Sequence, residues 1–245
     1  MNQTPPVPAL GKPAEYGELI LDRRLLLFHQ MGRFGGGSLL DVGCGNGAQT
    51  VTFAPLFDQV TGIDVVPEHI QRCTEMFQRL RLSHCRVVQY QGAIIPLADH
   101  AVGTVVCIET LEHVADESQT LSEIHRVLKP GGVFMITVPN KCWPFETHGA
   151  NLPLLPWNRV PFFSWLPPSV HRRFAKARIY TRRGIIRLLA SHGFTVDRVA
   201  YLTAPLDRIR WRPLRMLLLR SFFSSMSTRM PFLAPSIVVR ATRRA

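Results

Sequence analysis

The stretch LLDVGCGNGA, residues 39–48, decides the fold of this 245-residue chain. A short apolar run ends in a turn with three glycines in five residues, and a helical pattern follows. Glycine is needed where φ must be positive or where a Cβ would hold a ligand away from the backbone. A strand, a glycine turn and a helix also direct N–H groups and a helix dipole at an anionic group. The stretch therefore predicts a bound dinucleotide, a phosphate or another adenosine-bearing cofactor at the end of a buried strand.

Short apolar segments and helical segments alternate on both sides of this turn. Strands are expected at 38–42, 59–66, 86–90, 102–109, 133–138, 195–202 and 236–242, and helices at 13–32, 48–57, 67–82, 116–128 and 181–191. Strands that are apolar throughout and alternate with helices are typical of a parallel sheet covered on both faces. The pattern predicts an α/β, Rossmann-like, doubly wound and mostly parallel sheet of seven strands.

One domain is the expectation for a chain of this length. We expect a flexible arm at 1–12 and a single domain at 13–245, whose cofactor-binding core is 37–140. Residues 141–180 combine many prolines with tryptophan and phenylalanine, which predicts a lid over a pocket. Residues 203–235 form a basic amphipathic insert between the last two strands.

The composition excludes several classes of protein. A hydrophobic content of 46% with 19% charged residues is typical of a globular protein. We find no secretory signal and no apolar run of the roughly 20 residues that span a bilayer. The five cysteines never form a C-x-x-C pattern, which favours reduced thiols over zinc or disulfides. These features predict a cytoplasmic protein.

The positive charge is concentrated in the last third of the chain. Residues 166–245 carry 17 basic side chains against two acidic ones, while the whole chain has a net charge of +12. A basic amphipathic segment favours an anionic membrane surface first, packing or dimerisation second and RNA third. We therefore predict peripheral association with the inner face of the membrane through 203–235, and we do not expect nucleic-acid binding. A solvated, arginine-rich face is the alternative.

Asp41, two residues before the first glycine, helps to distinguish between the possible cofactors. Gly43, Gly45 and Ala48 fit the dinucleotide pattern, and Asp64 follows at the distance expected for a ribose-binding acid, so an NAD-dependent oxidoreductase is one hypothesis. Asp41, however, stands where it would repel a pyrophosphate. It would attract a cofactor that carries a positive amine or sulfonium.

Five motifs resemble those of the class I S-adenosylmethionine-dependent methyltransferases, in particular the type 11 group that includes ubiquinone- and menaquinone-pathway enzymes. They are LLDVGCGNG at 39–47, VTGIDVV at 60–66, IETLEHV at 108–114, LKPGGVFMITVPN at 128–140 and YTRRGIIRLLASHGF at 180–194. The resemblance implies a sheet with an antiparallel last strand, S-adenosylmethionine as cofactor and methyl transfer as activity. The implied acceptor is a small or amphipathic molecule, lipid-linked or quinone-type, methylated most readily at oxygen.

The resemblance also implies roles for particular residues. Asp41 would face the methionine amino group, and the turn at Gly43, Cys44 and Gly45 would let the backbone approach the cofactor. Asp64 would accept both ribose hydroxyls, and Val65 would pack on the adenine ring. Further cofactor contacts are implied for Ile108, Glu109, Gln91, Gly92 and Ala93. Relatives place an aspartate where Gln91-Gly92-Ala93 stands, which puts the contact to the adenine amine in doubt.

Two histidines are candidates for the base that a hydroxyl acceptor requires. His113 closes Glu109-x-x-Glu112-His113, where a turn would gather three side chains able to bind a metal or to serve a structural role. We expect no metal. His148 lies in the lid beside Glu146, where a dry pocket could tune it as a general base. A loop histidine that only pins the lid is the alternative.

Overall fold

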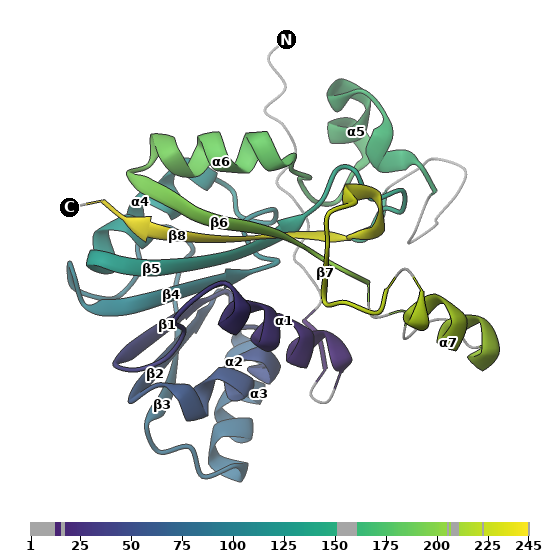
Figure 1. Ribbon diagram of the computed structural model, residues 1–245. Coiled ribbons are helices and arrows are strands. Elements are labelled where there is room, and N and C mark those ends of the chain that lie inside the picture. The colour runs from purple at the N-terminus through teal and green to yellow at the C-terminus, as the bar shows by residue number, and fades with distance from the viewer. Residues whose placement is uncertain are drawn as a thin grey trace.

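The computed structural model describes residues 13–15, 18–150, 161–204, 206, 211–221 and 223–244 (Figure 1). Its helices are α1 (Leu19–Gln30), α2 (Ala48–Phe53), α3 (Pro67–Arg79), α4 (Glu117–Val127), α5 (Pro168–Phe174), α6 (Arg182–Ser191) and α7 (Arg212–Arg220). Its strands are β1 (Ser38–Val42), β2 (Gln59–Asp64), β3 (Cys85–Gln89), β4 (Val102–Ile108), β5 (Leu128–Pro139), β6 (Phe194–Leu202), β7 (Ser227–Thr228) and β8 (Ser236–Arg243). Among these residues, no helix combines the length and the apolar character that a bilayer crossing requires.

All strands join one sheet in the order β3-β2-β1-β4-β5-β8-β6-β7. The first five strands of this order pair in parallel, and β8 is antiparallel to both β5 and β6. This confirms the predicted α/β, doubly wound and mostly parallel sheet with an antiparallel last strand. The two-residue β7 adds an eighth strand at the edge, where it pairs with the end of β6.

Helices cover both faces of the sheet, as predicted. On one face, α4 and α6 pack on inward side chains of the central strands, so that Leu121 and Leu189 are fully buried. On the other face, α1 and α2 bury Phe28 and Phe53 against the sheet, and α3 completes that layer through Cys73. Because β1 contributes to the cores on both faces, its residues are buried almost without interruption.

The sequence pattern placed several boundaries incorrectly. The Lys129–Gly132 segment was expected to separate a helix from a strand, but it belongs to β5, because Leu128 already pairs with Val102 of β4. The helix expected over 13–32 covers only Leu19–Gln30, and the one expected over 48–57 ends in a 3₁₀ turn at Ala54–Leu56. The lid contains regular elements despite its prolines, since α5 follows a 3₁₀ turn at Phe163–Trp165.

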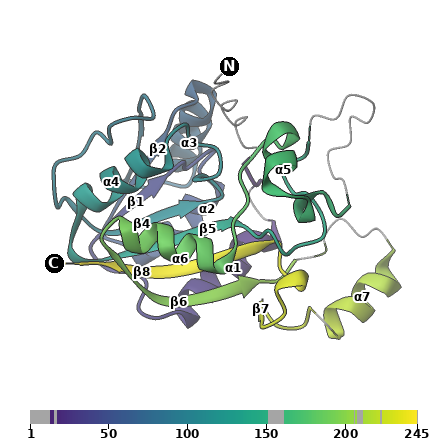
Figure 2. The ribbon, with the colours of Figure 1, turned by 90° about the horizontal axis from the view of Figure 1, so that it is seen from above.

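Some predictions fall outside the described residues. These are the arm at 1–12, the part of the lid at 151–160, and Arg208 and Arg210 of the insert. Within the described part of the insert, α7 projects away from the sheet (Figure 2). The same edge of the sheet carries α5, because both elements lie beyond the carboxyl ends of the parallel strands (Figure 1).

Candidate active site

The predicted site residues follow the carboxyl ends of β1, β2 and β4. These strands are neighbours in the sheet and end at Val42, Asp64 and Ile108. Ligands of open α/β sheets bind in the crevice outside such carboxyl ends. The sheet therefore gathers the glycine turn, the residues after β2 and the E-x-x-E-H segment after β4 at one edge.

The turn after β1 requires glycine because other parts of the chain approach it closely. Gly43 has a φ of +75°, and a Cβ placed there would lie 2.3 Å from the Thr110 side chain. Gly45 has a φ of +55°, and a Cβ there would lie 2.9 Å from Pro13. Residues 13–15 thus lie against the turn, and the Asn46 amide donates a hydrogen bond to the carbonyl of Ala14 (3.1 Å). The loop after β4 and the start of the described chain both border the turn.

Asp64 organises the site from the end of β2. Its carboxylate accepts hydrogen bonds from the backbone N–H groups of Gly45 (2.9 Å) and Val66 (3.0 Å). The ring of His69, on α3, places Nδ1 3.2 Å from Oδ1 of the same carboxylate. Through these bonds, Asp64 ties the turn after β1 to the turn after β2.

Asp41 is buried one residue before the end of β1. Its Oδ2 accepts a hydrogen bond from the Thr50 hydroxyl of α2 at 2.6 Å. Burial raises the pKa of Asp41 to about 7, the Thr50 hydrogen bond opposes this shift, and the charge of Asp64 adds to it. A carboxyl group in this state is ready to ionise when a cation arrives next to it.

The remaining predicted cofactor contacts divide into exposed and buried groups. Val65 is 37% exposed, and a Cβ on Gly92 would lie 3.4 Å from its Cγ1, so the structure brings Val65 and the 91–93 loop together. Gln91 and Ala93 are exposed in that loop. The Cys44 side chain packs instead into a core cluster with Cys73, so Cys44 can contact a ligand of the glycine turn only through its backbone.

Three charged side chains cluster beyond β4. Glu109 has a φ of +49°, an uncommon conformation for a residue other than glycine and one often found at functional sites. Glu112 is fully buried, and burial together with the neighbouring Glu109 raises the pKa of Glu112 well above its usual range. Arg24, a buried residue of α1, places its guanidinium 3.7 Å from Glu109. Its Nε is buried without a hydrogen bond among the described residues.

His148 extends from the lid onto this cluster. Its Nε2 lies 3.4 Å from Glu112 and 4.0 Å from Glu109, while its Nδ1 lies 3.0 Å from the Thr147 hydroxyl. The ring of His113 packs against it edge-on, with 4.9 Å between the ring centroids. The structure therefore brings together both histidines predicted as catalytic. The carboxylates that face the His148 ring are Glu112 and Glu109, and not its sequence neighbour Glu146.

The same cluster provides a set of potential metal ligands. Donor atoms of Glu112, His113 and His148 all lie within 4.8 Å of one another. Two imidazoles and one carboxylate suit a divalent transition metal ion, the alternative that the E-x-x-E-H motif raised. Of these ligands, only His148 comes from outside that motif.

Glu146 and His171 form a buried pair that supports the lid. Both side chains are almost fully buried, and Nε2 of His171 lies 2.9 Å from Oε2 of Glu146. The other oxygen of Glu146 accepts a hydrogen bond from the backbone N–H of His148 (3.1 Å). The pair therefore holds the backbone that carries His148 and connects it to α5.

Sequence analysis missed Arg24, His69 and His171. No local pattern marks them, because each partner lies on another element of the fold. The spacing of His69 from Asp64 was the one available signal: the residue five positions after a strand-end acid lies in the first turn of the following helix. Arg24 and His171 could be found only once the tertiary structure was known.

Residues 40–136 match the protein family described as a methyltransferase domain. The chain is 31% identical over 126 residues to a probable S-adenosylmethionine-dependent methyltransferase of Mycolicibacterium smegmatis, covering 51% of this chain and 46% of that protein. It is 33% identical over 144 residues to a ubiquinone biosynthesis O-methyltransferase of Pseudomonas paraeruginosa, covering 55% and 60%. The matches thus span less than two thirds of either relative.

Solved structures of methyltransferases share the fold. A protein from Mesorhizobium loti superposes with a TM-score of 0.63 at 18% identity, covering 91% of this chain and all of that chain (100%). One from Aquifex aeolicus gives a TM-score of 0.59 at 19% identity, covering 91% and 89%. Both are described as S-adenosylmethionine-dependent methyltransferases. Because the relatives are methyltransferases, they favour S-adenosylmethionine over NAD as the cofactor.

Proposed function

We propose that this chain, whose residues 40–136 match a methyltransferase domain, is an S-adenosylmethionine-dependent methyltransferase and that it methylates an oxygen atom of an amphipathic acceptor. The observation that carries the proposal is the position of the His148 ring, whose Nε2 lies 3.4 Å from Glu112 and 4.0 Å from Glu109 in the loop after β4. S-adenosylmethionine supplies, when bound, a methyl group on a sulfonium whose leaving group is a neutral thioether.

The residues around the turn suit the charges of this cofactor. The carboxylate of Asp64 offers paired acceptors for ribose hydroxyls, and its bonds to Gly45 and Val66 keep it in place. Asp41 would bind the ammonium of the methionine part. Arg24 has a buried guanidinium with an unsatisfied Nε, which suits it to the carboxylate of the same part. An acidic and a basic side chain together suit an amino-acid group, which carries both an ammonium and a carboxylate. They suit a pyrophosphate less well, because it carries only negative charge.

His148 would remove the proton of the acceptor hydroxyl. In the tautomer that serves this role, Nδ1 donates to the Thr147 hydroxyl and Nε2 has a free lone pair. Passage of the hydroxyl proton to Nε2 would leave the acceptor oxygen ready to accept the methyl group that the cofactor would supply. Glu109, at 4.0 Å, would stabilise the resulting imidazolium, and the new positive charge would favour the ionised form of Glu112, at 3.4 Å. His113 would hold the His148 ring in place by packing against it.

The side chains of the lid support the proposed acceptor class. The lid is rich in aromatic side chains, with the ring of Trp143 5.5 Å from that of Phe145 and the ring of Phe162 5.0 Å from that of Trp165. Relatives named as ubiquinone biosynthesis O-methyltransferase and 27-O-demethylrifamycin SV methyltransferase are named for O-methylation or for O-demethylated substrates. These names support oxygen as the acceptor atom and a bulky apolar molecule, free or lipid-linked, as the acceptor. The basic insert at 203–235 would then meet the anionic membrane from which such an acceptor comes.

Labelled-methyl transfer into fractionated lipid, glycan and RNA pools tests the proposal. We expect label in the lipid pool as an alkali-stable ether. His148→Ala should reduce turnover by at least about 100-fold while the affinity for S-adenosylhomocysteine stays unchanged. His192→Ala, a change far from the cluster, is the matched control. Turnover that survives His148→Ala within a few-fold contradicts the base assignment, and label confined to RNA contradicts the acceptor class.

A further inference from the structure

Apolar side chains are exposed mainly on one part of the chain. Of the 15 large apolar side chains that the described residues expose, 11 lie between positions 145 and 232. They belong to the lid, to α7 with the residue before it, and to the turn that precedes β8. These are Phe145, Phe162, Trp165, Leu166, Val170, Trp211, Leu214, Met216, Leu217, Met230 and Phe232. We call this set the apolar rim.

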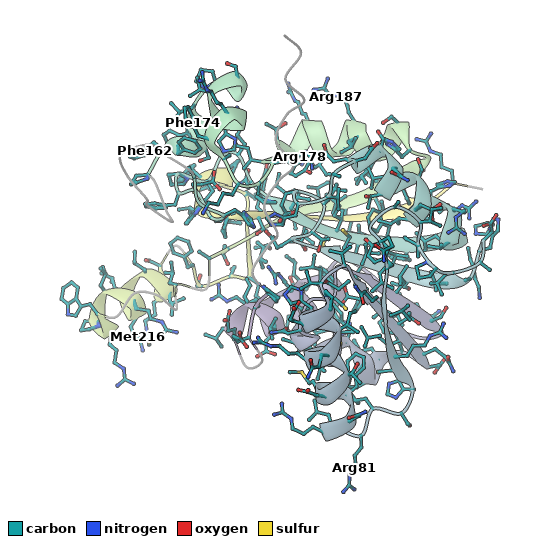
Figure 3. The ribbon with its side chains drawn as sticks, turned by 180° about the vertical axis from the view of Figure 1, so that it is seen from behind. Arg81, Phe162, Phe174, Arg178, Arg187 and Met216 are labelled. Atoms are coloured by element: carbon teal, nitrogen blue, oxygen red, sulfur yellow. The ribbon has the colours of Figure 1, made fainter. Side chains whose placement is uncertain are left out.

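The helix α7 carries the most exposed part of the rim. None of its residues is buried, and Trp211 and Leu217 are 66% and 64% exposed. A helix with leucines and a methionine in the interior would normally cover a core with them. Figures 1 and 2 show α7 projecting from the sheet in both views, and Figure 3 labels Met216 on this helix. Among the described residues of α7, Leu214, Met216 and Leu217 are therefore apolar side chains left exposed.

The start of the lid and the end of the insert are held together by one side chain. The Asn140 side chain, just after β5, donates hydrogen bonds to the carbonyls of Pro231 and Ala234, both at 2.8 Å. The side-chain carbonyl oxygen of Asn140 accepts a hydrogen bond from the backbone N–H of Cys142, at the start of the lid (3.0 Å). The two parts of the rim therefore stand at the same edge of the sheet. Phe162 and Met216 lie on one side of the molecule, and Arg81 lies at its other end (Figure 3).

The rim is accompanied by positive charge. Arg173, Arg212, Arg220 and Arg229 are exposed within the segments that carry it. The described residues after 165 include one acidic side chain, Asp197, which accepts a hydrogen bond from Thr242 and pairs with Arg240 on the sheet. The rim therefore carries apolar side chains and cations, and Glu146, the acidic side chain described within its segments, is buried.

We infer that the apolar rim docks this protein on a lipid bilayer with anionic headgroups. Exposed apolar side chains flanked by arginines bind the interface of such a bilayer through apolar insertion and headgroup attraction together. A second copy of the chain is a poorer occupant, because two rims of the same sign repel each other. Part of the rim lies on the lid segment that carries His148, so docking would place the candidate site next to the source of an amphipathic acceptor. This last point rests on the proposed function, whereas docking itself does not.

Co-sedimentation of the full chain with vesicles tests the inference. The chain should bind vesicles of phosphatidylcholine with phosphatidylglycerol at low salt, and bind phosphatidylcholine alone at least about tenfold more weakly. High salt should weaken binding to the vesicles that contain phosphatidylglycerol. Arg212→Gln together with Arg220→Gln should reduce the affinity about fivefold for each arginine, and Trp211→Ser with Leu217→Ser at least about tenfold.

Arg79→Gln together with Arg81→Gln is the matched control, since it removes the same charge at the far end of the molecule and should leave vesicle binding unchanged. Each variant is also titrated with S-adenosylhomocysteine, which must bind normally to show that the fold is intact. Absence of vesicle binding at low salt overturns the inference, and so does an equal loss in the control. Self-association that disappears in Trp211→Ser with Leu217→Ser, without vesicle binding, assigns the rim to a second copy. Failure of methyl transfer with intact vesicle binding refutes the proposed function alone.

Discussion

Replacing Asp41 with asparagine tests whether the glycine turn is built for a cation. In the folded chain, burial raises the pKa of Asp41 to about 7. The unfolded chain releases this proton at the ordinary value of about 4. The unfolded state therefore binds fewer protons between these values, and the free energy of unfolding falls as the pH rises from about 4 to about 7. A pKa difference of about three units between the folded and the unfolded chain corresponds to roughly 4 kcal/mol of unfolding free energy. This contribution is present below about pH 4 and fully lost above about pH 7.

The cofactor should reverse this penalty. An ammonium group beside Asp41 stabilises the ionised carboxylate, so the affinity for S-adenosylhomocysteine should rise by up to about tenfold per pH unit below about pH 7 and level off above it. In Asp41→Asn the affinity should be lower at neutral pH and should lose this dependence. The unliganded variant should also be more stable than the wild type at alkaline pH, because a neutral amide can accept the hydrogen bond of Thr50 without a buried charge.

Isothermal titration with S-adenosylhomocysteine between about pH 5 and about pH 9, combined with urea unfolding over the same range, measures both effects. Asp22→Asn on the exposed side of α1 is the control, because it removes the same charge from a solvated position. An affinity of the wild type that does not change with pH, or an Asp41→Asn variant that binds as tightly as the wild type at pH 8, would refute the reasoning.

Two further changes probe the turn and the lid. Gly43→Ala forces a Cβ to within 2.3 Å of Thr110 at a φ of +75°, so thermal denaturation should show a loss of about 2–4 kcal/mol. Gly37→Ala, at a φ of +64° with no atom within 4 Å, should cost only about 1 kcal/mol, and equal losses would contradict the role of Thr110. Glu146→Gln weakens the pair with His171, so turnover should fall about tenfold with unchanged affinity for S-adenosylhomocysteine and a shifted pH profile of kcat. A parallel loss of cofactor affinity would instead indicate a general structural role.

Local pattern was sufficient to predict the sheet and the glycine turn after β1. The apolar runs of β1 and β4 and the glycines between β1 and α2 are contiguous in sequence, and their chemistry is readable there. The start of β5 at Leu128 was not predicted, because a proline and two glycines normally break an element and only pairing with Val102 holds that backbone extended. In such a case tertiary pairing overrides local preference.

The site was predictable only where one segment supplies it. Glu112 and His113 belong to one turn, and their proximity followed from spacing. Arg24 reaches Glu109 across 85 positions, and His171 reaches Glu146 across 25, so no window of sequence contains both partners. For the same reason, the sequence suggested Glu146 as the partner of His148, whereas the folded chain provides Glu112.

Asn140 has a consequence for how this fold can diversify. Its side chain fixes the points at which the lid leaves the sheet and the insert returns to it. Among the described residues, the lid at 141–180 and the insert at 203–235 contribute only the two-residue β7 to the sheet, so they can change in length and composition while the other strands stay in place. New acceptor preferences can therefore arise by exchange of either segment while the cofactor half of the domain remains as it is. A chimaera that carries a relative's lid on this sheet should fold as long as Asn140 and its carbonyl partners are retained.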